Sequence, residues 1–209
     1  AAQVMLVICC LLSAVLLLLC IMVIQLIPRQ EMNLEEFSSL IDWAYVAFSL
    51  FTILWSIAYV TSSIPFCMWF YRAYKNMRGL GYSTTTFKPG WAPGSFFIPI
   101  VNLYRPYQIA KEIWEDSDPE TDTDTSLVSY WWAAYLVAAT ITNIAGNMLP
   151  DDVPSPDLRS ALFVDAAGHL VYIAAGILAL MLVRGIDSRQ ETMRQAYLEN
   201  SFSERISEL

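Results

Sequence analysis

One aspartate and one histidine lie four residues apart in an otherwise uncharged stretch of the chain. Asp165 and His169 interrupt the apolar run 161–183, and because residues at i and i+4 share a helix face, the two side chains can pair. If this run spans a membrane, the aspartate costs about 2.5–3.5 kcal/mol and must be paired, protonated or close to water. Three alternatives follow: a satisfied ion pair, a site that binds a proton or ligand, or an axial bond from His169 to a metal or tetrapyrrole beside Gly168. A single histidine argues against a zinc site made by protein alone.

The element that must position this pair is a membrane-spanning helix. Of 209 residues, 56% are hydrophobic and 15% are charged, whereas soluble domains have about 45–50% and 25%. Four stretches supply the roughly 20 apolar residues that a helix needs to cross the hydrocarbon. They are 4–27, 43–71, 127–149 and 161–183, and the first is too long for the apolar region of a signal peptide, so we expect it in the mature protein. We predict an all-α membrane protein with four transmembrane helices.

A fifth apolar stretch, 91–104, is too short to cross and contains Pro93 and Pro99. We expect this proline-broken segment to be re-entrant or interfacial. An amphipathic helix follows from Pro106, with Tyr107, Ala110, Ile113 and Trp114 on one side and Lys111, Glu112 and Glu115 on the other. We expect it to lie along the cytoplasmic membrane surface.

The Lys and Arg residues orient the chain. Ten of its 12 basic residues fall between the second and third spans or after the fourth, and such loops stay in the cytoplasm. We therefore expect both termini to be cytoplasmic. The predicted organisation is a first transmembrane helix at 1–28, an outer loop at 29–42, a second helix with a basic end at 43–78, a cytoplasmic segment at 79–126, a third helix at 127–149, an outer loop at 150–159, a fourth helix at 160–184 and a cytoplasmic tail at 185–209.

This orientation puts several polar residues in the outer half of the bundle, where we expect one polar pocket. Its candidate members are Asp42, Asn143, Asn147, Asp165 and His169. The second span also has a face of hydroxyl and acidic residues at spacings of 3 and 4: Asp42, Tyr45, Ser49, Thr52, Ser56, Tyr59 and Ser63. This face is either a seam that packs against another helix or the wall of a wet groove.

Basic residues near the cytoplasmic side are candidate contacts for lipid headgroups: Arg72, Lys75, Arg78 and Arg105, together with Asn102. The acidic run 115–124 lacks the pattern of a calcium loop and is expected to be a solvated linker whose end, at Asp124, Thr125 or Ser126, caps the third span. The four cysteines lie in apolar runs without metal-binding spacing, which predicts buried thiols. The net charge of −8 disfavours nucleic acid as a partner.

An ordered set of short motifs characterises the middle of the chain. It comprises Trp69-Phe70-Tyr71-Arg72-Ala73-Tyr74-Lys75-Asn76, Pro89-Gly90-Trp91-Ala92, Phe97-Ile98-Pro99-Ile100-Val101-Asn102-Leu103, Arg105-Pro106-Tyr107-Gln108, Glu112-Ile113-Trp114 and Trp131-Trp132. This set resembles a bacterial multi-span membrane family known as domain of unknown function number 4328. The resemblance covers roughly 55–183 and implies a bacterial inner-membrane location, but it implies no activity.

We expect a non-enzymatic accessory or interaction subunit of a larger membrane assembly, with membrane lipids and other membrane subunits as partners. The alternative is a small transporter, channel, or sensor of a ligand or proton that uses the outer pocket. A lipid-modifying enzyme would need an acid–base constellation that the sequence lacks, since neither GxSxG nor HExxH occurs. No cofactor is required, although bound lipid is expected and a tetrapyrrole on His169 is the remaining option.

Overall fold

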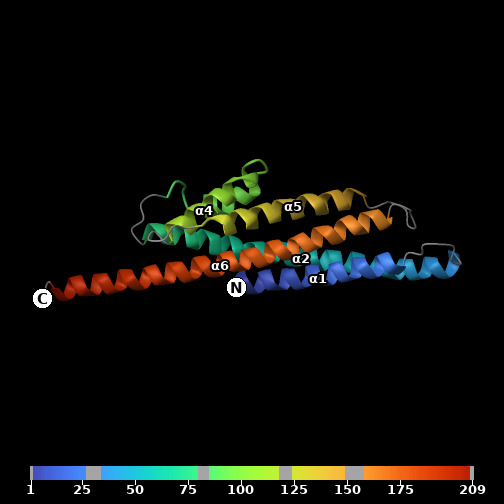
Figure 1. Cartoon of the computed structure of the whole chain (residues 1–209), viewed down its shortest axis with the longest axis horizontal. Coiled ribbons are helices and arrows are strands. Elements are labelled where there is room, and N and C mark those ends of the chain that lie inside the picture. Colours follow the sequence, from blue (N-terminus) through green and yellow to red (C-terminus); the bar gives the residue numbers. More distant parts are fainter. Residues whose placement is uncertain (1, 27–33, 80–84, 118–123, 149–157, 208–209) are drawn as a thin grey trace. The chain divides into compact units, whose positions relative to one another are not determined.

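The computed structural model describes residues 2–26, 34–79, 85–117, 124–148 and 158–207, and the side chains of 26, 34–42, 44–45, 78–79 and 207 lie outside this description. Every regular element within these ranges is a helix (Figure 1). The long helices are α1 (Ala2–Leu26), α2 (Leu34–Gly79), α5 (Ser126–Met148) and α6 (Leu158–Ser207). Between α2 and α5 lie α3 (Trp91–Gly94), η1 (Ser95–Phe97), η2 (Val101–Leu103) and α4 (Arg105–Asp116).

All four long helices are long and apolar enough to cross a membrane, which confirms the predicted spans. Two extend well beyond the hydrocarbon thickness, since α2 has 46 residues and α6 has 50. Helix α2 already begins in the predicted outer loop, and α6 continues through the predicted tail. Helix α6 continues because the residues after its apolar part include many that favour helix, such as Arg, Gln, Glu, Met and Ala. It also contains no proline that would end the helix at the membrane surface.

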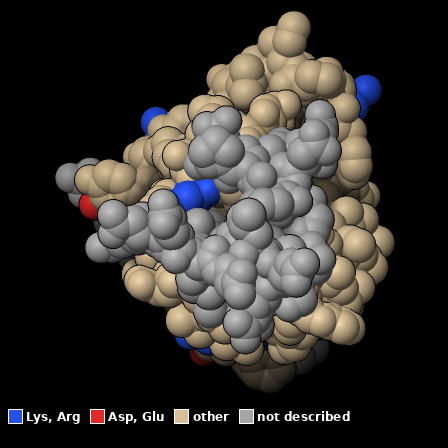
Figure 2. Space-filling model, turned by 90° about the vertical axis from the view of Figure 1, so that its right-hand side faces the viewer, with Lys and Arg blue, Asp and Glu red and all other residues tan. Residues whose placement is uncertain are grey.

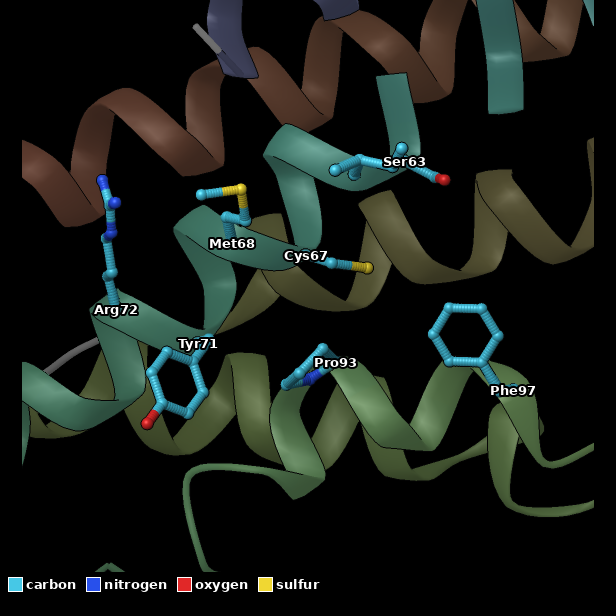
Figure 3. A pocket seen from close by; sticks show the side chains of 8 residues that line it. Ser63, Cys67, Met68, Tyr71, Arg72, Pro93 and Phe97 are labelled. Atoms are coloured by element: carbon cyan, nitrogen blue, oxygen red, sulfur yellow. The ribbon is translucent and has the colours of Figure 1, made fainter. Parts of the chain in front are cut away.

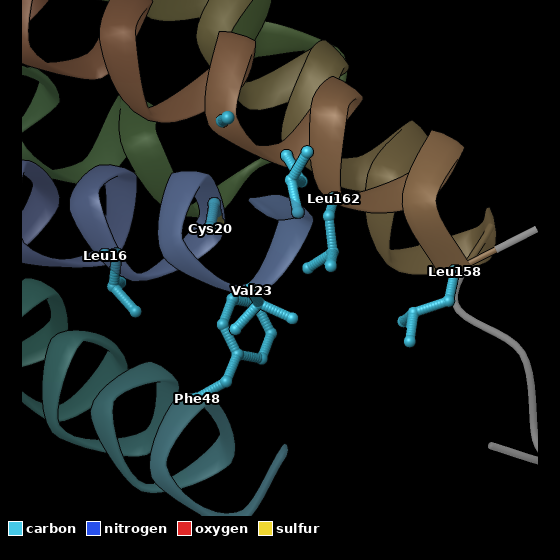
Figure 4. Close-up of a cluster of buried hydrophobic side chains, with 8 residues drawn as sticks. Leu16, Cys20, Val23, Phe48, Leu158 and Leu162 are labelled. Atoms are coloured by element: carbon cyan, nitrogen blue, oxygen red, sulfur yellow. The ribbon is translucent and has the colours of Figure 1, made fainter. Parts of the chain in front are cut away.

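The chain divides into two compact units, which are described separately. Unit 1 contains 3–62 and 133–177, and unit 2 contains 63–132 and 178–209. In unit 1, a buried cluster unites Leu16, Cys20 and Val23 of α1, Phe48 of α2, and Leu158 and Leu162 of α6 (Figure 4). Helix α5 packs closely on α6, because a Cβ at Gly168 would lie only 2.6 Å from Thr142 Cγ2. Small residues of this kind let membrane helices approach each other.

Unit 2 contains the proline-broken segment, which forms short helical turns instead of a span. The predicted amphipathic helix forms as α4, and Ile109, Ala110, Ile113 and Trp114 on its apolar side are buried. That side packs on protein within unit 2: the Trp114 ring lies against Gly185 of α6, where a Cβ would come within 2.7 Å of it. Helix α6 thus covers part of the apolar side of α4, at Trp114, and the position of α4 along the membrane surface stays a prediction.

Apolar side chains of the proline-broken segment point outward instead. Phe97 and Ile100 are each 75% exposed, and Ile98, Leu103 and Tyr104 are also exposed. The described surface in Figure 2 is mostly neither acidic nor basic, with isolated Lys, Arg, Asp and Glu atoms. A large exposed apolar surface is what a protein presents to hydrocarbon.

Candidate functional site

Asp165 is the centre of a polar cluster buried in unit 1. Its Oδ2 lies 3.5 Å from His169 Nε2, one helical turn along α6. The same oxygen accepts a hydrogen bond from the Cys20 thiol of α1, with Sγ 3.4 Å away. The predicted pairing of Asp165 with His169 is thus present, and a residue from the first span joins it.

His169 is enclosed, since only 4% of it is exposed. The Trp55 ring of α2 meets the imidazole edge-on at a centroid distance of 5.5 Å. Trp55 is itself held by a hydrogen bond from Nε1 to Ser13 Oγ of 2.8 Å and by the ring of Tyr172. The Nδ1 atom of His169 is buried and has no hydrogen-bond partner among the described residues.

This arrangement places two ionisable side chains close enough to share a proton. When His169 Nδ1 carries a proton of its own, one further proton shared between Nε2 and the Asp165 carboxylate oxygen at 3.5 Å leaves the pair electrically neutral. A net charge would remain after the proton leaves or a second one arrives, and charge is costly in an apolar bundle. In the neutral pair the second imidazole proton lies on Nδ1, which is buried and has no described acceptor for a hydrogen bond.

The other predicted pocket residues do not join this cluster in the described structure. Asn143 and Asn147 are exposed, and Asn147 Nδ2 donates to the Asn143 backbone carbonyl at 2.7 Å, so they form a pair of their own. The side chain of Asp42 lies outside the described residues. Conversely, the prediction missed Cys20 and Trp55. Cys20 lies at spacings of 3 and 4 residues from Leu16 and Val23, and all three are buried with Ser13 on one face of α1. This spacing could have indicated from the sequence that Cys20 faces the inside of the bundle.

The hydroxyl face of α2 is only partly covered. Tyr59 is half-buried, with its hydroxyl 2.9 Å from that of Tyr135 on α5. Thr52 and Ser56 are exposed, and their hydroxyls donate to the carbonyls of Phe48 and Thr52 on their own helix. These two hydroxyls therefore do not serve as a packing seam within unit 1.

The predicted headgroup contacts fall into two groups in unit 2. Arg72 and Lys75 are exposed on α2, whereas the side chain of Arg78 lies outside the described residues. The Arg105 guanidinium lies over the Phe87 ring at 4.2 Å, with the rings of Tyr104 and Trp91 also within 6 Å. Arg105 Nε and Asn102 Oδ1 are buried without a described hydrogen-bond partner. Arg105 is thus part of the folded segment, and Arg72 and Lys75 are accessible.

The described residues contain no group of three His, Cys, Asp or Glu side chains that could hold a metal ion. Thr142 and Ile141 of α5 lie against Gly168, so Gly168 does not leave the open space that the axial-ligand option assumed beside it.

The end of the acidic linker is folded onto α5. Asp124 Oδ1 accepts a hydrogen bond from the Ser126 backbone N–H at 2.9 Å and another from the Ser126 hydroxyl, and its carbonyl accepts one from Trp114 Nε1. The hydrogen bonds from Ser126 lower the pKa of the Asp124 carboxyl below its usual value. Asp124 therefore provides the predicted cap for the first turn of α5.

A comparison with known families identifies what this architecture belongs to. The family described as a domain of unknown function (DUF4328) matches residues 34–188, a range that includes Asp165, His169 and the proline-broken segment. No curated protein and no solved structure shows significant similarity to the chain. The match covers most of the chain and agrees with the motifs of its middle part, and the protein therefore belongs to the DUF4328 family.

Proposed function

We propose that this protein is a non-enzymatic, proton-responsive membrane protein, with the Cys20–Asp165–His169 cluster as its sensing site. The observation that supports the proposal is an aspartate and a histidine 3.5 Å apart inside an apolar helix bundle. An ionisable residue at such a position suggests function, because the bundle tolerates it only at a cost.

The surroundings of the cluster limit which groups respond to pH. Helix α1 contributes the Cys20 thiol, and α6 contributes the Asp165 carboxyl and the His169 imidazole. Helix α2 contributes Trp55, and α5 contacts α6 beside the cluster through Thr142, neither of which is charged. A change in protonation must therefore act on the contacts of these four helices. Close packing at Gly168 favours a sensor over an open water path.

Fluorine NMR of protein labelled with 5-fluorotryptophan tests whether the bundle responds. Trp55 is assigned by the resonance that disappears in Trp55→Phe, and this resonance should shift when the pH is moved between 5 and 8. His169→Gln and Asp165→Asn should abolish or alter that shift, while the resonance of Trp91 in unit 2 serves as an internal control. A Trp55 resonance that stays constant over this range, or that titrates identically in His169→Gln, would contradict the proposal.

We also propose a location in the bacterial inner membrane with both termini in the cytoplasm. The support is the placement of ten of the 12 Lys and Arg residues in the second connection and after the fourth span. Reporter fusions within 85–90 and near 205 should report the cytoplasm, and a fusion in 150–157 should report the outer side. An external signal from the 85–90 fusion would overturn this orientation.

The exposed hydroxyls of α2 favour a second function, that of a subunit in a larger membrane assembly. Thr52 and Ser56 lie among Ile53, Leu54 and Ile57, which are 52–56% exposed. Small and hydroxyl residues are common where membrane helices of different subunits pack together.

This second function predicts a stoichiometric complex after gentle detergent extraction, measured by light scattering on a sizing column. The double change Thr52→Leu and Ser56→Leu should dissociate it. Thr140→Leu is the matched control, because Thr140 is an exposed threonine of α5 whose hydroxyl also bonds its own helix. A monodisperse single chain, or a complex unaffected by the double change, would refute the subunit role. If the face instead lines a water path, Ser49→Cys, Ser56→Cys and Ser63→Cys would all react with a water-soluble maleimide.

A further inference from the structure

Unit 2 contains an open cavity of about 520 Å³ between α2 and the α3–η1 segment. Cys67 and Met68 line it from α2, and Pro93 and Phe97 line it from the opposite side (Figure 3). Ser63 lies at one end of the α2 wall, and Tyr71 and Arg72 lie at the other. The volume is within the range of about 300–1,000 Å³ that small-molecule sites occupy.

The cavity adjoins a helix that is apolar enough to cross a membrane. Its α2 wall belongs to the candidate span Val46–Met77, and the flanking side chains of Met68 and Phe97 are 51% and 75% exposed. In hydrocarbon, an acyl chain suits an apolar groove of this kind better than water does, since water would leave its hydrogen bonds unmade there.

The charge at one end selects the lipid. Arg72 is exposed, forms no ion pair with a described residue and is followed one turn later by the exposed Lys75. An acyl chain gains little by leaving bilayer hydrocarbon for an equally apolar groove, so preference among lipids must come from the headgroup. A basic residue near the membrane surface attracts an anionic lipid by about 1 kcal/mol, which corresponds to roughly fivefold in affinity.

We propose that this groove binds one acyl chain of an anionic phospholipid, with the phosphate at Arg72. The proposal is independent of the Cys20–Asp165–His169 cluster, because every residue that it uses belongs to unit 2. Its failure would leave the sensing proposal intact, and the reverse also holds.

The headgroup is tested by native mass spectrometry of the detergent-purified chain, titrated with phosphatidylglycerol or phosphatidylcholine. One phosphatidylglycerol should bind more tightly than phosphatidylcholine, and Arg72→Gln should weaken it roughly fivefold. Arg184→Gln is the matched control, because Arg184 is an exposed arginine on α6 that does not line the cavity. Equal affinity for both lipids, or equal effects of the two variants, would overturn the assignment of the phosphate to Arg72.

The groove is tested by filling it. Cys67→Trp should abolish retention of the lipid, whereas Ile57→Trp, which adds the same ring to an exposed α2 position in unit 1, should bind as the unmodified chain does. If Cys67→Trp does not fold, alkylation of the natural Cys67 by N-ethylmaleimide replaces it, mapped to the Cys67 peptide. Phosphatidylglycerol should slow this alkylation at least severalfold. Undiminished lipid binding by folded Cys67→Trp, or an alkylation rate that saturating lipid leaves unchanged, would overturn the proposal.

Discussion

Replacement of Tyr74 by phenylalanine should loosen unit 2 at a defined point. Tyr74 of α2 is fully buried, and its hydroxyl donates to Glu112 Oε2 of α4 at 3.0 Å. The same hydroxyl accepts a hydrogen bond from the Phe87 backbone N–H at 2.8 Å. One oxygen thus joins α2, α4 and the chain that leads into the proline-broken segment.

The expected cost follows from the two bonds that are lost. A hydrogen bond to a charged group is worth about 1.5–3 kcal/mol, and a donor left unsatisfied costs about 1–3 kcal/mol if it stays buried. Phe87 is half-buried, so water can bond its backbone N–H in part and reduce the cost of losing the second hydrogen bond. We therefore expect Tyr74→Phe to lower the free energy of unfolding by about 2–3 kcal/mol.

Denaturant unfolding in detergent micelles measures the total cost, and amide hydrogen exchange measures the local one. Exchange at Phe87 should accelerate roughly 30-fold or more, since 1.4 kcal/mol corresponds to a factor of ten. Tyr130→Phe is the control, because Tyr130 is 66% exposed. If Tyr74→Phe unfolds like Tyr130→Phe and leaves exchange at Phe87 unchanged, the reasoning about this hydroxyl is refuted.

Two further predictions concern glycine packing and helix capping. Gly185→Ala places a Cβ 2.7 Å from the Trp114 ring, and overpacking of about 1–3 kcal/mol should outweigh the gain of up to about 1 kcal/mol from helix propensity. The melting temperature should fall for Gly185→Ala but not for Gly146→Ala, because a Cβ at Gly146 would meet no atom within 4 Å. Equal changes in melting temperature would contradict the packing argument. The lowered pKa of Asp124 means that its cap on Ser126 is complete above the ordinary aspartate pKa of about 3.9 and is lost as the pH falls through the lowered value. Amide exchange at Ser126 should report this loss, Asp124→Asn should show no such pH dependence, and identical profiles would refute the role of the carboxylate.

The membrane architecture could be predicted because hydrocarbon imposes simple demands. The absence of charge over about 20 residues identifies a span, and Pro93 and Pro99 in a 14-residue stretch exclude one. The same arguments do not locate where a helix ends, because hydrogen bonding within α6 continues after the apolar residues stop. These arguments also do not reveal which helix packs on the apolar side of α4, where the Trp114 ring lies against Gly185 of α6.

The candidate site was predictable only along one helix. Asp165 and His169 share a face of α6 by their spacing, so their proximity follows from the sequence. Cys20 and Trp55 come from other helices, and their approach depends on how α1 and α2 rotate about their axes. The asparagines of α5 show the same limit, because the expected position in the outer half of the bundle did not determine which way Asn147 points.

The protonation state of His169 tests the central claim most directly. His169 is the only histidine of the chain, so protein labelled with nitrogen-15 histidine gives one pair of imidazole resonances in micelles or bilayers. The sensing site predicts that these resonances change when the pH is moved between 5 and 8 and that Asp165→Asn alters this change. An imidazole that keeps one tautomer across this range, in both the unmodified chain and Asp165→Asn, would contradict the proposal.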